Sequence, residues 1–238
     1  MADILEMTSS DISPARDDIL ENLGIPSGQE LSSTVEELIT EALGLFDRTC
    51  SPRAIYAPVT VSEFSGIYHG EGLNDQKTPL GDMYEQAREI VLFALTIGKE
   101  ITEKISGLFL DDNLALAGVL DATASAGAET AADRVEAHYW DREISAELKK
   151  NAPDIYRFAP GYCGWHITGQ KKLFRFLDPG KIGITLLPSY MMSPLKSLSG
   201  AIIVTEKSST FGNAYNVCKQ CVTHWCRTRK KIFQEYGG

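Results

Sequence analysis

The sequence has no long hydrophobic run, because no stretch approaches the roughly 20 consecutive apolar residues that a helix needs to cross a bilayer. Its first residues also lack the basic segment and apolar core that mark a secretory signal. From these two absences we expect a cytoplasmic protein that has no membrane partner.

An excess of positive charge is also missing. Lysine and arginine total 23, against 32 aspartate and glutamate residues, and the net charge is −9 at pH 7. A surface of this sign repels a phosphate backbone. We therefore expect no nucleic-acid partner.

Cysteine is scarce, with five residues in the chain. An odd number in a reducing compartment indicates thiols or metal ligands rather than a disulfide framework. Cys218, Cys221 and Cys226 have a spacing typical of metal ligands, and Cys163 or His224 could supply a fourth ligand. Zinc would make the site a structural clip, and an iron–sulfur cluster would carry single electrons. The alternative is a set of thiols that binds no metal.

What the chain does contain suits one substantial core, since 43% of its 238 residues are hydrophobic and 23% are charged. Periodicity and turn residues predict helical segments at 17–23, 33–49, 82–148 and 170–177, and strands at 53–64, 182–187 and 198–205. Helices and strands that do not strictly alternate favour an α+β fold with a mainly antiparallel, twisted sheet and packed helices. We divide the chain into an N-terminal arm and helix (1–50), a central domain (51–210) and a cysteine-rich tail (211–238).

Within the predicted helical segment, alanines crowd residues 122–132, which predicts tight packing against another backbone. Glu129 is an acid in this run, and an isolated buried charge is unfavourable, so its carboxylate must face water or a partner. Asp121, Ser125 and Glu129 are spaced by four residues and therefore share one helix face.

The stretch from Tyr156 to Gly200 has the features of a ligand site. Glycines and prolines crowd a short loop in which a backbone can approach a ligand closely. Polar and aromatic side chains lie within ten residues of one another there: Arg157, Tyr162, Trp165 and His166. The alternative is a buried loop with turn glycines.

The ordered motifs of this stretch resemble the activation (reactivation) domain of cobalamin-dependent methionine synthase. They are Arg157-Phe-Ala-Pro-Gly-Tyr162, a short helix with Leu173, Phe174 and Leu177, Ile182-Gly-Ile184, and Met192-x-Pro-x-x-Ser-x-Ser-Gly200. The resemblance covers roughly residues 80–205. It departs from the family where Cys163-Gly-Trp-His166 follows the tyrosine, and the cysteine-rich tail has no counterpart.

The resemblance implies a site for S-adenosylmethionine. Arg157 would bind the carboxylate, the backbone of Ala159 and Gly161 would meet the ligand, and Tyr162 would place an aromatic surface beside a cation. Glu129 would accept the ammonium group, unless Ser125, one helical turn earlier, occupies the acidic position of the family.

The same resemblance implies that Lys196, Ser197 and Ser199 face cobalamin, where they could contact its propionamides. The alternative is a strand entrance with turn serines. Methyl transfer of this kind depends on positioning, so no general base is expected.

The function implied is that of a free-standing reactivation protein. It would bind S-adenosylmethionine and support reductive methylation of cob(II)alamin on a separate corrinoid protein or on a cobalamin-dependent methyltransferase such as methionine synthase. Any catalysis would be of the methyltransferase type and would need that partner, with flavodoxin or ferredoxin as candidate electron donors. Two alternatives are a non-catalytic module that binds a corrinoid protein and an iron–sulfur redox protein with a vestigial S-adenosylmethionine site.

Overall fold

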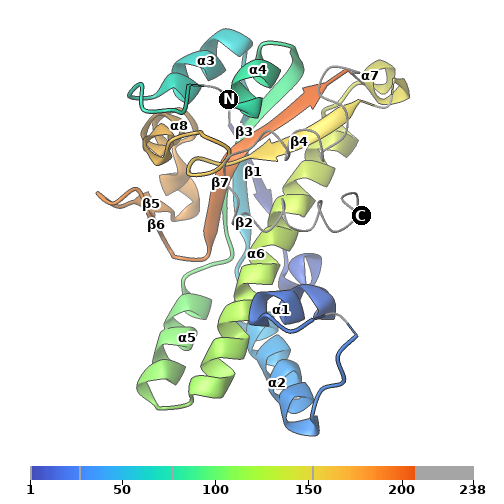
Figure 1. The fold of residues 1–238 in the computed structure, drawn as a ribbon, viewed down its shortest axis with the longest axis vertical. Coiled ribbons are helices and arrows are strands. Elements are labelled where there is room, and N and C mark those ends of the chain that lie inside the picture. The colour runs from blue at the N-terminus through green and yellow to red at the C-terminus, as the bar shows by residue number, and fades with distance from the viewer. Residues whose placement is uncertain (1, 27, 77, 152, 207–238) are drawn as a thin grey trace.

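The computed structural model describes residues 2–206 apart from positions 27, 77 and 152. Its centre is a five-stranded sheet in the order β1-β2-β3-β7-β4, in which all neighbouring strands are antiparallel (Figure 1). The strands are β1 (Asp3–Glu6), β2 (Arg53–Pro58), β3 (Ala87–Thr96), β7 (Ser197–Thr205) and β4 (Asp154–Phe158). Helices cover the sheet, and the predicted α+β class is confirmed.

The central strand β3 is where the sequence-based prediction of helix was wrong. Val91, Phe93 and Leu95 pack into the core on one face of the sheet, whereas Leu92 and Ala94 pack into the core on the other. A strand buried on both faces is apolar at nearly every position, so its apolar residues also satisfy a helical period. The helix α4 (Pro79–Tyr84) ends before this strand begins.

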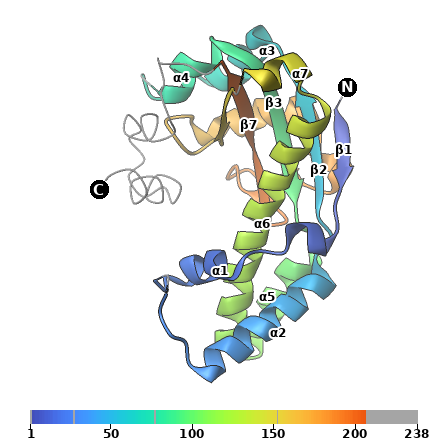
Figure 2. The ribbon, with the colours of Figure 1, turned by 90° about the vertical axis from the view of Figure 1, so that its right-hand side faces the viewer.

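The long helix α6 (Leu114–Arg142) covers one face of the sheet and continues beyond it (Figures 1 and 2). Its far end packs with α1 (Arg16–Leu23), α2 (Ser33–Thr49) and α5 (Glu100–Leu110). A Cβ atom on Gly127 of α6 would collide with the Phe46 ring of α2. This small-residue run therefore packs tightly, but its closest neighbour at Gly127 is the ring of Phe46 rather than another backbone.

The first fifty residues contribute to this same core. β1 extends the sheet, η1 (Ser9–Ile12) and α1 follow, and the side chains of Ile12, Ile19 and Leu20 are buried. The N-terminal residues are therefore part of the hydrophobic core and do not form an arm on the surface. The domain boundary at residue 50 stays a prediction.

The opposite face of the sheet is covered by shorter elements. They are α3 (Val61–His69), α4, η2 (Ile167–Gly169), α8 (Gln170–Leu177) and η3 (Pro179–Ile182). The strand expected over 53–64 ends earlier, at Pro58, because Thr60 and Glu63 form a capping box that starts α3. The helix predicted at 170–177 is confirmed as α8.

The remaining elements lead into and out of the ligand-site stretch. α7 (Ala146–Lys150) precedes β4, and a small hairpin of β5 (Thr185–Leu186) and β6 (Met192–Ser193) precedes β7. The strand expected over 198–205 is confirmed as β7, whereas the strand expected over 182–187 is reduced to β5, and β4 was not expected.

A search for a membrane-crossing helix among the described residues finds no candidate of the required length and hydropathy.

Candidate functional site

Arg157 lies on β4, a strand at the edge of the sheet, and alternation along that strand decides where its side chain goes. Tyr156 and Phe158 pack into the core on the side of α3, α4 and α8. Ile155 packs against the core on the α6 side. Successive side chains of a strand point to opposite faces, so Arg157 reaches toward α6.

The guanidinium of Arg157 meets three carboxylates on α6. Its nitrogens lie 2.8 Å from Asp133 Oδ1, 3.3 Å from Glu129 Oε2 and 3.8 Å from Glu136 Oε2. Spacings of four and three residues put these acids on one helix face. Burial raises the pKa of Glu136, and Asp133 adds to this effect whereas Arg157 opposes it. The structure therefore brings the sequence-predicted pair of Arg157 and Glu129 together, and adds two acids to it.

A second cation from the sheet side meets α6 further along the same face. Lys196 Nζ lies 2.8 Å from Asp121 Oδ1, 2.8 Å from Ser125 Oγ and 3.2 Å from the carbonyl oxygen of Asp121. Its side chain is 11% exposed. We call Asp121, Ser125, Glu129, Asp133 and Glu136 the α6 stripe, because Lys196 binds its first part and Arg157 its second.

Ser197 and Ser199, which were expected to face cobalamin, are buried in this conformation. Ser197 Oγ donates to the carbonyl oxygen of Pro194 at 2.7 Å. Ser199 Oγ has no hydrogen-bond partner among the described residues. Since Lys196 is turned onto α6, all three side chains point into the protein. Their role toward cobalamin stays a prediction.

The loop after β4 is a compact set of turns. The Gly161 amide donates to the Trp165 carbonyl at 2.7 Å, and the Tyr162 amide donates to the Ala159 carbonyl at 3.1 Å. Gly161 has a φ of 96°, in the left-handed region that favours glycine. Trp165 is buried against Phe64 and anchors the loop, whereas the Tyr162 side chain is 48% exposed.

This loop is fastened to the segment 72–78. The His166 amide donates to Asn74 Oδ1 at 2.9 Å, and the Asp75 amide donates to the Gly164 carbonyl at 3.0 Å. A Cβ atom on Gly164 would lie 2.5 Å from Thr78 Cγ2, so the two segments approach at a distance that only glycine permits. The loop conformation therefore depends on segment 72–78 as well as on its own turns.

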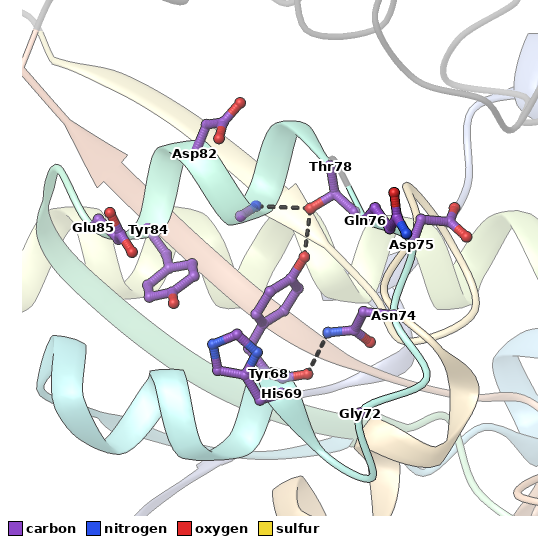
Figure 3. A pocket seen from close by; sticks show the side chains of 11 residues that line it. Tyr68, His69, Gly72, Asn74, Asp75, Gln76, Thr78, Asp82, Tyr84 and Glu85 are labelled. Carbon is purple, nitrogen blue, oxygen red and sulfur yellow. Dashed lines mark hydrogen bonds between the residues drawn. The ribbon is translucent and has the colours of Figure 1, made fainter.

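Beside that segment lies a cavity of about 350 Å³ (Figure 3). Tyr68 and Asn74 shape its wall, because the Tyr68 hydroxyl hydrogen-bonds to Thr78 Oγ1 and Asn74 Nδ2 donates to the Tyr68 carbonyl at 2.7 Å. The described lining residues include neither Arg157 nor Tyr162. The cavity and the site predicted from sequence are therefore separate features.

The predicted metal site falls largely outside the described residues, because Cys218, Cys221, Cys226 and His224 lie beyond position 206. Cys163 is half-buried with a φ of 52°. Within the described part of the chain, no group of three or more histidine, cysteine or acidic residues is arranged to hold a metal ion.

Sequence reasoning missed Asp133 and Glu136 as partners of Arg157. Their spacing from Glu129 was readable, since residues four and seven positions along a helix share its face. The missing signal was β4 itself, because only a strand at this place turns Arg157 toward that face.

Comparisons with known proteins identify the family of the chain. A family model described as "Vitamin B12 dependent methionine synthase, activation domain" matches residues 74–230. The crystal structure of the MetH reactivation domain bound to AdoHcy superposes with a TM-score of 0.65 at 18% identity, over 89% of this chain and 81% of that chain. No curated protein matches the sequence. Because the family model spans more than half of the chain, the chain belongs to the family of vitamin B12-dependent methionine synthase activation domains.

Proposed function

We propose that this chain binds S-adenosylmethionine where β4 meets α6 and supports the reductive methylation of a corrinoid held by a separate protein. Family membership supports the link to a corrinoid partner. The observation that carries the proposal is the pairing of Arg157 with carboxylates on α6. The division into an activation domain at 51–210 and a tail at 211–238 is part of the same proposal.

The residues present fit the amino-acid portion of the ligand. Its carboxylate suits the guanidinium of Arg157, which can bind two oxygens at once. Its ammonium group suits Glu129, whose Oε2 lies 3.3 Å from the guanidinium, so one zwitterion can replace the existing ion pair. The exposed ring of Tyr162 suits the sulfonium. The structural neighbour bound to AdoHcy also supports this ligand class.

The contribution of the chain to the reaction is positioning. The corrinoid supplies the cobalt that accepts the methyl group, and the residues named above hold the donor in place and exclude water. The partner is a corrinoid-binding protein or a cobalamin-dependent methyltransferase, and flavodoxin and ferredoxin are candidate electron donors.

The first test is calorimetric titration of S-adenosylmethionine into the wild-type chain and into Arg157→Ala. We expect saturable binding to the wild type and an affinity at least roughly tenfold lower in the variant, because the carboxylate loses a bidentate partner. Arg53→Ala is the matched control, since Arg53 lies on β2 and pairs with Glu6 at 2.6 Å on the other side of the sheet. No saturable binding at millimolar ligand, or equal binding by wild type and Arg157→Ala, would refute the proposal.

The second test adds a separately purified corrinoid protein in its inactive oxidation state and a chemical reductant. We expect the absorbance spectrum of the corrinoid to change to that of the methylated form only when both this chain and S-adenosylmethionine are present. Binding without methyl transfer would instead support a non-catalytic module.

A further inference from the structure

Counting the residues that the structure describes, the ion cluster around Arg157 has more negative than positive charge. One guanidinium faces three carboxylates, on Glu129, Asp133 and Glu136. Two other cations near α6 in the described part of the chain have acidic partners elsewhere, because Lys196 pairs with Asp121 at 2.8 Å and Arg134 pairs with Asp11 at 3.5 Å. The excess charge is therefore local to the end of the α6 stripe that Arg157 binds.

A bound amino-acid ligand would leave part of this excess in place. This inference rests on the proposed function, in which the ligand carboxylate binds Arg157 and the ligand ammonium group binds Glu129. Asp133 and Glu136 would then lose their cation, and because they follow Glu129 on the same helix face, they would adjoin the remainder of the ligand. S-adenosylmethionine presents a positive sulfur there, whereas S-adenosylhomocysteine presents a neutral one.

We propose that Asp133 and Glu136 make the site selective for the positively charged sulfonium substrate over the neutral thioether product. When the methyl group leaves, sulfur keeps the bonding electron pair and becomes neutral, while the reduced corrinoid provides the pair for the new bond. The product then loses its attraction to the two carboxylates. The two acids therefore strengthen the binding of the substrate without strengthening that of the product.

A purely structural role for the two acids makes a different prediction. If they only fasten β4 to α6, their removal changes stability, or changes the affinity for both ligands by the same factor. Selectivity by charge instead changes the ratio of the two dissociation constants. This ratio is insensitive to how readily Arg157 is released, because both ligands carry the same carboxylate and ammonium groups.

The experiment measures both dissociation constants by calorimetry for wild type, Asp133→Asn and Glu136→Gln. We expect wild type to prefer S-adenosylmethionine, and each variant to lower that preference by roughly three- to tenfold, as one charge acting through partly screened solvent predicts. Added salt should lower the wild-type preference as well. Asp133→Glu, which keeps the charge, should preserve it.

Asp141→Asn is the matched control. Asp141 lies on the same helix, about 12 Å along its axis from Asp133 at 1.5 Å per residue, and the change removes the same charge. The ratio should stay at the wild-type value. An unchanged ratio in both Asp133→Asn and Glu136→Gln, with S-adenosylmethionine still bound, would overturn this inference and leave the proposed function standing. Failure of the wild type to bind S-adenosylmethionine would overturn both.

Discussion

Two cations reach α6 from the sheet side, and their surroundings differ. Lys196 has one carboxylate, one hydroxyl and one carbonyl as partners, and only 11% of its side chain is exposed. Arg157 is 25% exposed and faces three carboxylates whose side chains are 32–70% exposed. The first site is balanced in charge and its cation is largely buried, although Asp121 is 45% exposed. Among the described residues, the second site has excess negative charge and is more open to solvent.

This difference separates a structural contact from an exchangeable one. A largely buried cation is difficult to release, because its ammonium group would lose its partners without regaining full hydration. Exposed ion pairs contribute little, so a ligand can replace them. We therefore expect Lys196 to hold the segment before β7 on α6, and Arg157 to exchange its partners when a ligand binds. Contact of Lys196 with cobalamin would first require it to leave Asp121.

The largest expected effect is on stability. Lys196→Met should lower the free energy of unfolding by roughly 1–3 kcal/mol, because Ser125 and the backbone of Asp121 lose the charge-assisted hydrogen bonds of a largely buried ammonium group. Arg157→Met should lower it by less than about 1 kcal/mol, since Glu129 and Asp133 are well exposed and can be rehydrated. Urea unfolding of both variants measures the difference. A larger loss for Arg157→Met than for Lys196→Met would contradict the comparison.

The next effect is on ligand affinity. Arg157→Lys keeps the charge but loses the planar fork that binds two carboxylate oxygens. We expect the dissociation constant of S-adenosylmethionine to rise roughly tenfold, which corresponds to about 1.4 kcal/mol, with little change in stability. Calorimetry gives the affinity and urea unfolding provides the control. Wild-type affinity in the lysine variant would show that charge alone is sufficient at this position.

The smallest effect is on the pH dependence of stability. Burial raises the pKa of Glu136 above its ordinary value of 4.5 in the folded chain, so the folded state binds this proton more tightly than the unfolded state does. Its contribution to stability is present below pH 4.5 and is lost as pH rises through the folded pKa. Glu136→Gln should remove this decline in unfolding measurements from pH 4 to 7. A steeper decline in the variant would mean that Arg157 outweighs burial.

Much of the ligand-site stretch was readable from the sequence because its features are local. The turn at Gly161 and the helix at 170–177 depend on neighbours close in the chain. Gly164 and Trp165 instead contact Thr78 and Phe64, which are distant in the sequence. The acid spacing on α6 was also readable, since a helix repeats every 3.6 residues.

The sequence by itself determined the α+β class, the alanine-rich helix and the motif that places the chain in its family. Only the tertiary structure decided that β3 is a strand and that β4 turns Arg157 onto α6. It also decided that the side chain of Lys196 is less exposed to solvent than that of Arg157. The physical reason is that the apolar residues of a strand buried on both faces of a sheet have no distinctive period. In addition, the burial of an ion pair is set by elements far apart in the chain, which local patterns do not specify.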